Sequence, residues 1–172
     1  KSLDDAVKVA ENLMNEGYDA YYALATFEDG KSRKTANVKQ LRSLFIDLDC
    51  GEGKPYETQT EALTSLKSFC KATGMPKPTL VNSGGGIHAY WTLTEPLSRE
   101  EWTPLAEKLK SMCDDHDLFA DPVVTADSVR ILRVPGTQNF KQDEARPVAL
   151  LGSAAQPNQL NTIKDVIGEP VL

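Results

Sequence analysis

The stretch Leu44-Phe45-Ile46-Asp47-Leu48-Asp49 has the pattern of a buried strand that ends in two acidic residues. Because side chains alternate across a strand, Asp47 and Asp49 point to the same side, with Cβ atoms roughly 7 Å apart. Two ionised carboxylates on an apolar strand repel each other and lose hydration. Mg²⁺ or Mn²⁺ resolves that conflict, because both cations prefer carboxylate oxygens. The alternative is a strand that ends in solvent at its charged end.

The composition is that of a globular domain with a real hydrophobic core. Of the 172 residues, 40% are hydrophobic and 26% are charged, and we expect residues 1–172 to form a single domain. The chain begins at Lys1 without a methionine, which indicates a piece excised from a longer multidomain protein. No apolar run approaches the ~18 residues of a membrane span, and no signal peptide opens the chain. The 3 widely spaced cysteines favour a reducing, cytoplasmic location.

The net charge of −6 has the wrong sign for a protein that coats nucleic acid. Any contact with nucleic acid must therefore come from a local basic patch, and affinity for bare duplex should be weak. Cys113 and His116 have a spacing that occurs in zinc sites, but no second pair of ligands accompanies them. A zinc site is therefore disfavoured.

Helix and strand patterns mix irregularly along the chain. Capping boxes at Thr58 with Glu61 and at Ser98 with Glu101 open two helices, and Gly74 ends the first of them. Because the elements do not follow strict βαβ order, we expect an α+β fold with a mixed or largely antiparallel sheet. The pattern predicts helices near 3–15, 58–74 and 98–114, and strands near 19–27, 44–49, 79–82, 87–93, 123–124, 131–134 and 148–151.

A glycine turn between two predicted strands lies in the string VNSGGGIHAYW, residues 81–91. Consecutive glycines let the backbone approach a ligand, and the stretch Ser83, Gly84, Gly85 could hold an anion such as phosphate on its N–H groups. His88, on the strand that follows, can donate a hydrogen bond to a phosphate oxygen. An ordinary hairpin turn and a structural histidine are the alternatives. The turn matches neither a P-loop nor a dinucleotide fingerprint, because a strand rather than a helix follows.

The segment FADPVVTADSVRILRVPGTQNFK, residues 119–141, carries acidic groups, then basic groups, then a turn. Arginine suits bidentate contact with phosphate and stays charged when partly desolvated. If the segment is extended, Arg130 and Arg133 project to opposite faces, so that only one of them need face an active site. Arginines paired with surface carboxylates are the alternative. The candidate residues of the segment are Asp121, Asp127, Arg130, Arg133, Asn139 and Lys141.

Together the three elements supply what nucleotidyl transfer requires. Two or three carboxylates hold a pair of Mg²⁺ or Mn²⁺ ions, which activate a 3′-hydroxyl and neutralise the triphosphate as pyrophosphate leaves. A glycine turn, a histidine and an arginine hold the phosphates in line for attack. No Ser-His-Asp order or activated cysteine offers an alternative of comparable completeness.

These residues resemble the catalytic domain of the archaeo-eukaryotic primase superfamily, the primase-polymerases, and most closely its phage- and plasmid-encoded members fused to helicases. The family's hhDhD strand is matched by FIDLD, and its S-G-G-G-x-H-x-Y-W segment by SGGGIHAYW. Its D…T…R-x-x-R-V-P-G-T-x-N-x-K segment is matched by ADPVVTADSVRILRVPGTQNFK. The motifs occur in the family's order, and the resemblance runs from about residue 21 to residue 151.

The resemblance implies an RRM-like catalytic module packed against a smaller N-terminal α/β unit, with the active site between them. It implies that Asp47 and Asp49 are catalytic metal ligands. The third carboxylate of the family should lie well upstream of the R-x-x-R-V-P segment, which favours Asp121 and leaves Asp127 as the second choice.

For the nucleotide, the resemblance implies that His88 contacts the phosphates, with Ser83 nearby. Arg133 matches the basic triphosphate-binding position, and Arg130 or Asn139 supports it. Many relatives carry an extra basic residue in the serine-to-histidine loop, where this chain has glycines, so backbone amides take more of the phosphate binding here. The zinc-stem cysteines of some relatives have no convincing counterpart.

The sequence therefore predicts a template-directed DNA primase-polymerase. Its expected partners are template DNA, a primer, nucleoside triphosphates and a helicase domain in the full-length protein, inside a bacterial host. Two other functions stay open. One is a replication initiator or scaffold that binds nucleic acid or nucleotide without robust catalysis, and the other is a different metal-dependent nucleotidyl transferase or phosphoesterase on a similar sheet.

Overall fold

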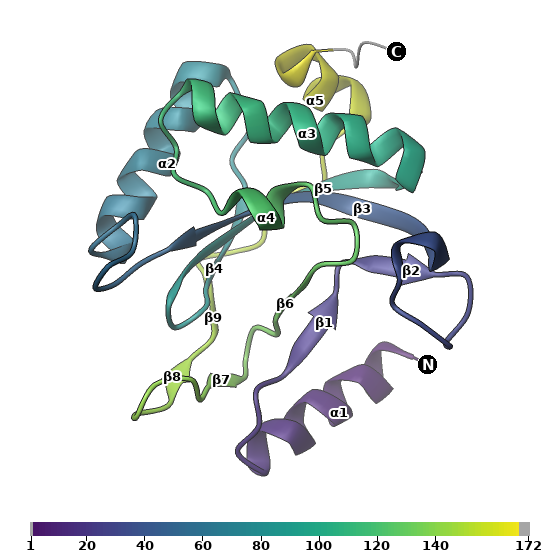
Figure 1. The fold of residues 1–172 in the computed structure, drawn as a ribbon, viewed down its shortest axis with the longest axis vertical. Coiled ribbons are helices and arrows are strands. Elements are labelled where there is room, and N and C mark those ends of the chain that lie inside the picture. Colours follow the sequence, from purple (N-terminus) through teal and green to yellow (C-terminus); the bar gives the residue numbers. More distant parts are fainter. Residues whose placement is uncertain (1, 169–172) are drawn as a thin grey trace.

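The computed structural model describes residues 2–168 as helices around a curled antiparallel sheet (Figure 1). The helices are α1 (Leu3–Asn15), α2 (Gln59–Thr73), α3 (Arg99–Asp115), α4 (Pro122–Thr125) and α5 (Leu160–Ile167), with a 3-10 turn at Thr35–Asn37. The strands are β1 (Tyr21–Ala23), β2 (Ala25–Phe27), β3 (Val38–Asp49), β4 (Thr79–Asn82), β5 (Gly86–Ser98), β6 (Ile131–Arg133), β7 (Gln138–Asn139), β8 (Arg146–Pro147) and β9 (Ala149–Leu151).

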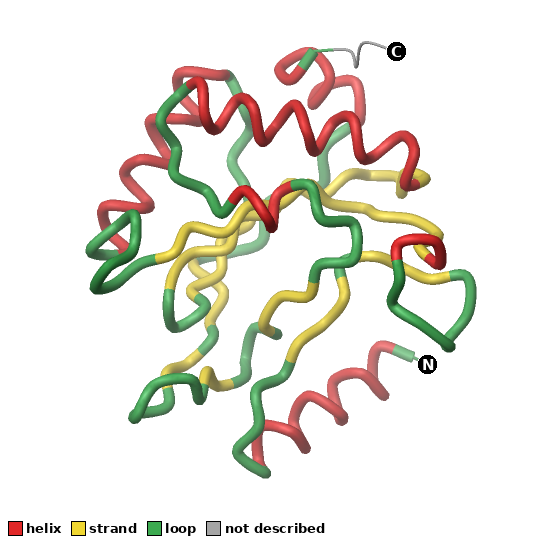
Figure 2. Tube along the Cα trace, viewed as in Figure 1, coloured by secondary structure: helices red, strands yellow, loops and turns green. Residues whose placement is uncertain are grey.

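The main sheet has 5 strands in the order β2-β3-β5-β4-β9, and all its pairs are antiparallel. Within it, the run β3-α2-β4-β5-α3 is the βαββα unit that the RRM-like prediction requires. Helices α2, α3 and α5 lie together beyond one side of the sheet, as the red segments of Figure 2 show. The α+β prediction is confirmed, with a sheet that is antiparallel throughout the described residues.

The hydrophobic core lies between the sheet and these helices, and it sets the position of β3. Leu44, Ile46 and Leu48 are fully buried in this core, as are Trp91 of β5 and Trp102 of α3. Burying apolar side chains of this size stabilises each by about 1.5–3 kcal/mol. The acidic end of β3 is therefore carried on a strand that the core holds rigidly.

The helix ends follow the local signals in the sequence. Ser98 and Glu101 form a complete capping box at the start of α3. At the start of α2, the Thr58 side chain accepts from the Glu61 N–H, but the Glu61 carboxylate accepts from the Glu57 N–H instead of closing the box. Gly74 ends α2 in the left-handed conformation, with φ 82°.

A smaller unit lies on the other side of the sheet, and distant parts of the sequence build it. Strand β1 pairs with β6, and α1 lies beside them (Figure 1). The predicted strand 19–27 is thus two strands in two different sheets. The break falls at Leu24, whose N–H donates to the Arg130 carbonyl (3.1 Å) while β2 joins the main sheet. The unit therefore includes residues 131–133 as well as the N-terminal ones.

The predicted strand at residues 123–124 is wrong, because these residues form the short helix α4. Asp121 caps this helix by accepting the Val123 N–H (2.9 Å), and Pro122 occupies its first turn. An aspartate followed by proline is a strong helix start, because proline needs no hydrogen bond there. Here this start outweighs the β preference of two valines.

No helix among residues 2–168 is long and apolar enough to cross a bilayer. The Cys113 side chain is buried, and the His116 ring lies edge-on against Phe69 at 6.0 Å. Neither of them belongs to a cluster of possible metal ligands in the described part of the chain.

Candidate metal and nucleotide site

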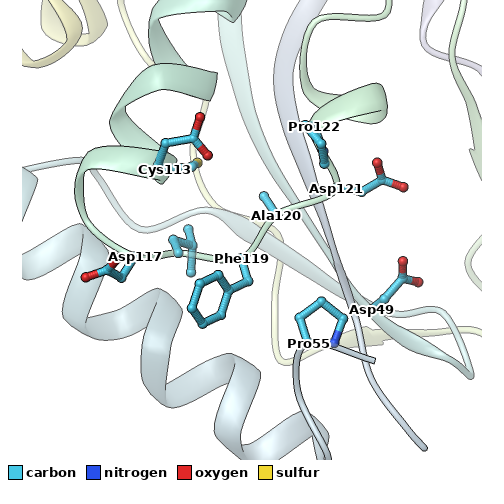
Figure 3. A pocket seen from close by; sticks show the side chains of 10 residues that line it. Asp49, Pro55, Cys113, Asp117, Phe119, Ala120, Asp121 and Pro122 are labelled. Carbon is cyan, nitrogen blue, oxygen red and sulfur yellow. The ribbon is translucent and has the colours of Figure 1, made fainter. Parts of the chain in front are cut away.

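Three carboxylates from two distant segments meet at the end of β3. Asp47, Asp49 and Asp121 each offer an oxygen, and these oxygens lie within 4.8 Å of one another. The Asp121 N–H donates to the Asp47 carbonyl (2.8 Å), which anchors the start of α4 to the edge of β3. Figure 3 shows the carboxylates of Asp49 and Asp121 side by side. We call these three residues the acidic triad.

The acidic triad is electrostatically unfavourable without a cation. Burial, together with the charges of Asp49 and Asp121, raises the pKa of Asp47 to about 7, against the opposing charges of Arg130 and Lys54. A carboxyl that resists ionisation beside two other acids gains when a divalent cation binds. An oxygen-only donor set of this kind suits Mg²⁺ or Mn²⁺ rather than zinc.

Asp127, the second choice for the third carboxylate, lies outside the triad. Its carboxylate is 3.5 Å from Arg130 Nε and accepts the Val129 N–H at 3.0 Å. These contacts make Asp127 a turn residue that neutralises part of the arginine charge. Of the two candidates, Asp121 is therefore the one whose carboxylate lies beside Asp47 and Asp49.

The glycine turn packs against the acidic end of β3. Gly86 pairs with Asp49, and a Cβ on Gly86 would lie 2.2 Å from the Leu48 carbonyl oxygen, so only glycine fits. Gly84 has φ 85°, and its N–H donates to Asn82 Oδ1 at 2.8 Å. The Ser83 hydroxyl donates to the Gly86 carbonyl at 3.2 Å. The Ser83 hydroxyl and the Gly84 N–H thus already have partners that shape the turn.

His88 lies directly opposite Asp47 in the β3–β5 pair, with its Nε2 3.6 Å from Asp47 Oδ1. The side chain is 5% exposed, and burial together with the charge of Arg133 lowers its pKa to about 4. The imidazole is therefore neutral at pH 7, and its contact with Asp47 is not an ion pair. Its buried Nδ1 has no hydrogen-bond partner among the described residues.

Arg133 is held in place by two residues of the smaller unit. Its Nη1 lies 2.7 Å from Asp19 Oδ1, and its guanidinium carbon lies 4.9 Å from the Tyr21 ring centre. Nη1 still lacks a hydrogen bond, so its contact with Asp19 is an ion pair with a poor angle. Burial would raise the pKa of Asp19, but the Phe140 N–H and Arg133 hold it below its usual value.

Asn139 supports the glycine turn from the far end of the chain. Its Nδ2 donates to the Ser83 carbonyl at 2.8 Å, and its Oδ1 accepts the Lys141 N–H at 3.0 Å. Arg146 adds a hydrogen bond from Nη1 to the Gly84 carbonyl at 3.1 Å. Asn139 is 4% exposed, so its side chain fixes the position of the turn by hydrogen bonding rather than acting as a free donor.

These groups line an open pocket of about 380 Å³ between the main sheet and the smaller unit, which we call the basic pocket. Arg130 and Arg133 both border it, although an extended segment would require only one of them to do so; Arg130 lies just before β6 begins at Ile131. Four buried side-chain polar atoms among the described residues lack a hydrogen bond, and three of them are His88 Nδ1, Arg130 Nε and Arg133 Nη1. The two arginine atoms lie near the carboxylates of Asp127 and Asp19, at 3.5 Å and 2.7 Å. Buried polar atoms without a hydrogen bond are rare in native proteins, and here they lie in the cationic wall of the basic pocket.

The structure adds residues that the sequence reasoning missed. Lys54, in the turn after β3, lies on the basic pocket and opposes the pKa rise of Asp47. Tyr21 also lines the pocket, and Asp19 holds Arg133 from behind. A lysine in a polar turn gives no signal of its own, and the pairing of Asp19 with Arg133 depends on the meeting of β1 and β6.

Comparison with known proteins finds a similar sequence and similar solved structures. No protein-family profile matches the chain. A "Replication protein" of Clostridium perfringens is 32% identical over 124 residues, which are 70% of this chain and 29% of that protein. The chain thus spans less than a third of the length of this curated relative.

Two solved structures share the fold. The AEP domain of the primase-polymerase (PrimPol) of cyanophage S-2L superposes with a TM-score of 0.68 at 18% identity, covering 93% of this chain and 76% of that one. The primase RepB′ superposes with a TM-score of 0.58 at 17% identity, covering 96% and 50%. The chain therefore has the fold of these two primase domains. The fold that the family resemblance in the sequence implies is confirmed.

Proposed function

We propose that this domain catalyses template-directed nucleotidyl transfer, joining a nucleoside triphosphate to the 3′-hydroxyl of a DNA-paired strand with release of pyrophosphate. The observation that carries the proposal is the position of the acidic triad at the edge of a pocket lined by arginines and lysines. A negative cluster beside a basic pocket is what a metal-bound triphosphate requires. Neither part alone distinguishes this chemistry from a simple anion site.

The acidic triad fits a pair of Mg²⁺ or Mn²⁺ ions, with Asp47, Asp49 and Asp121 as their carboxylate ligands. When bound, such ions lower the pKa of an attacking hydroxyl and neutralise the leaving group. The Asp121 N–H bond to the Asp47 carbonyl holds two of the ligands at a constant separation. The pKa of about 7 for Asp47 supports this fit, because a cation removes the cause of the shift.

The protein's own groups position the triphosphate. Arg133, oriented by Asp19 and stacked on Tyr21, presents a fork of N–H donors that matches phosphate oxygens. His88 is neutral, and a neutral imidazole with its hydrogen on Nδ1 donates to a phosphate without adding charge. Arg130 supplies a second cation at the mouth of the basic pocket.

The glycine turn contributes its shape. Asn139 holds Ser83 in place by a hydrogen bond to its carbonyl. Gly84 and Gly86 allow the turn to pack closely against its neighbours, Gly86 against β3. Gly85 lies on the basic pocket and would face the phosphates. In this proposal Ser83, Gly84 and Asn139 act on the nucleotide through the position of the turn.

The proposed partners are a DNA template, a primer and nucleoside triphosphates, inside the cell. A helicase region in the longer protein is part of the same proposal, because the chain spans 29% of a replication protein. With a net charge of −6, the domain relies on the basic pocket and on the longer protein for its hold on nucleic acid.

A primer-extension assay with Mn²⁺ or Mg²⁺ and labelled nucleotides tests the proposal. We expect extension by the wild-type chain and a loss of about 10²–10³-fold in Asp49→Asn, typical of removing a charged group at a reacting centre. Asp115→Asn, an exposed acid at the end of α3 and outside the triad, is the matched control and should extend normally.

The same assay has two outcomes that would overturn the proposal. In one, the wild-type chain binds DNA or nucleotide but incorporates none with either ion, which favours the initiator or scaffold function. In the other, Asp49→Asn extends as well as the wild type, which removes the acidic triad from the chemistry.

A further inference from the structure

A second pocket, of about 350 Å³, also borders the acidic triad, at Asp49 and Asp121 (Figure 3). Asp49 and Asp121 lie at one edge of it and Asp117 at the opposite edge, with Phe119 and Pro55 between them. We call it the acidic pocket. It shares Asp49 and Asp121 with the basic pocket, so the triad separates two cavities of different chemistry.

Phe119 is the main apolar surface of the acidic pocket, and it is exposed yet fixed. Its residue exposure is 55%, which is high for a phenylalanine. Its N–H donates to the Tyr56 hydroxyl at 3.0 Å, and its ring lies 5.9 Å from the ring of the buried Tyr56. An exposed aromatic ring whose position is fixed by such contacts can stack with another flat ring.

The charges of the acidic pocket exclude one class of ligand and suit another. No lysine or arginine lines it, while Asp114 and Asp117 add to the two triad acids at its edge. Phosphate groups are repelled here and attracted to the basic pocket. A neutral nucleobase is accepted, because it stacks on an aromatic ring and offers N–H groups to carboxylates.

The two cavities can be matched to the two substrates of the reaction. The triphosphate occupies the basic pocket, and the attacking hydroxyl approaches the triad from the side opposite the leaving group. The acidic pocket shares only Asp49 and Asp121 with the basic pocket, so it is the cavity beside the triad that the triphosphate leaves free. A nucleoside with its sugar at the triad would place its base over this ring.

We propose that the acidic pocket binds the terminal nucleobase of the strand whose 3′-hydroxyl attacks, with Phe119 as its stacking surface. This inference rests on the proposed function, since it names the occupant of the other half of the same site. It assigns the two sides of the triad to the two substrates: nucleotide phosphates on the basic side and the primer end on the acidic side.

A primer with 2-aminopurine as its 3′-terminal base, annealed to a template, tests the proposal without catalysis. Titrated with the wild-type chain and no triphosphate, its fluorescence should change as the base stacks. We expect Phe119→Ala to weaken this binding by about 5- to 100-fold, the usual worth of one base–aromatic stack, and Phe119→Tyr to restore it. Val123→Ala is the control, because Val123 follows Asp121 by two residues as Phe119 precedes it by two, and is 69% exposed; it should match the wild type.

Steady-state extension gives the second readout. Phe119→Ala should raise KM for the primer end by a similar factor and leave KM for the nucleotide unchanged. If wild type and Phe119→Ala extend with equal primer KM and equal fluorescence change, the pocket inference fails while the proposed function stands. If the wild type never extends but the fluorescence change depends on Phe119, the base site stands and the proposed function fails.

Discussion

The basic pocket and the acidic pocket share two carboxylates, Asp49 and Asp121, but are built in different ways. Buried polar groups from distant segments make the basic pocket: His88 on β5, Arg133 on β6 and the turn that Asn139 straps. The acidic pocket comes mostly from one stretch, residues 113–122, and its apolar surface is an exposed ring. The first holds charge at a large desolvation cost, whereas the second holds almost no buried charge.

This difference indicates what each pocket can bind. The arginines and lysines that line the basic pocket suit a ligand that carries the opposite charge. An exposed ring beside carboxylates suits a flat, neutral ligand with hydrogen-bond donors. The contrast therefore distinguishes the two cavities beside the triad, which the three carboxylates alone do not do.

The strongest test of this contrast is to remove Arg133 from the basic pocket. We expect Arg133→Ala to weaken nucleotide binding by about 10- to 150-fold, because a partly desolvated, charge-assisted contact is lost. Arg133→Lys should recover only part of this, since lysine lacks the planar fork. Calorimetric titration with a nucleoside triphosphate and Mg²⁺ measures both. Primer-end binding should be unaffected, and a nucleotide affinity equal to wild type would refute the placement of the triphosphate.

A second test concerns the Asp47 carboxylate of the triad. It uses the pH dependence of stability in the metal-free protein. The folded pKa of Asp47, about 7, is above its ordinary value of 3.8, so its contribution favours folding below pH 4 and is lost as pH rises through 7. With a chelator at pH 8, Asp47→Asn should therefore be more stable than wild type, by roughly 1–3 kcal/mol. At pH 4 the two should be nearly equal.

Thermal denaturation across this pH range, with and without Mn²⁺, measures the effect. Adding Mn²⁺ at pH 8 should stabilise the wild type and leave Asp47→Asn almost unchanged, because the variant lacks a ligand. If Asp47→Asn is less stable than wild type in chelator at pH 8, the carboxylate is not under the strain described here.

The smallest expected effect lies in the acidic pocket. Asp117 has φ 54° at the end of α3, where the Leu118 N–H donates to the Cys113 carbonyl (2.9 Å) and the Asp117 N–H to Asp114 (3.3 Å). This is a Schellman motif with aspartate where glycine is preferred. Asp117→Gly should therefore stabilise the protein by about 0.5–1 kcal/mol, and Asp117→Asn should be close to wild type.

Denaturant unfolding of the three chains measures this, and primer-end binding sharpens it. A more stable Asp117→Gly that binds the primer end less tightly would indicate that the acid is kept for the pocket's chemistry. A less stable Asp117→Gly would show that the aspartate side chain, rather than its backbone conformation, stabilises this helix end.

Local patterns in the sequence were enough to predict the elements that carry the site. The alternation in Leu44–Asp49 predicts a buried strand with two acids on one side, and β3 confirms it with Leu44, Ile46 and Leu48 in the core. The capping residues and Gly74 likewise place the helix ends, because a cap depends on neighbours within one turn. Motif order then indicated the family.

Local patterns failed where a residue's partner is far away in the sequence. Residues 123–124 form a helix because Asp121 caps it at the edge of β3, and the strand 19–27 divides between two sheets. β propensity describes how a side chain suits a pleated surface, and it does not say which surface is present.

The sequence by itself determined the residue types of the site: paired acids on an apolar strand, a glycine turn, a histidine and two arginines. Only the tertiary structure decided that Asp121 rather than Asp127 completes the triad, and that Asp19 holds Arg133. The physical reason is that periodicity and caps record interactions over a few residues. The meeting of β3 with α4, and of β1 with β6, is decided by the packing of the whole core.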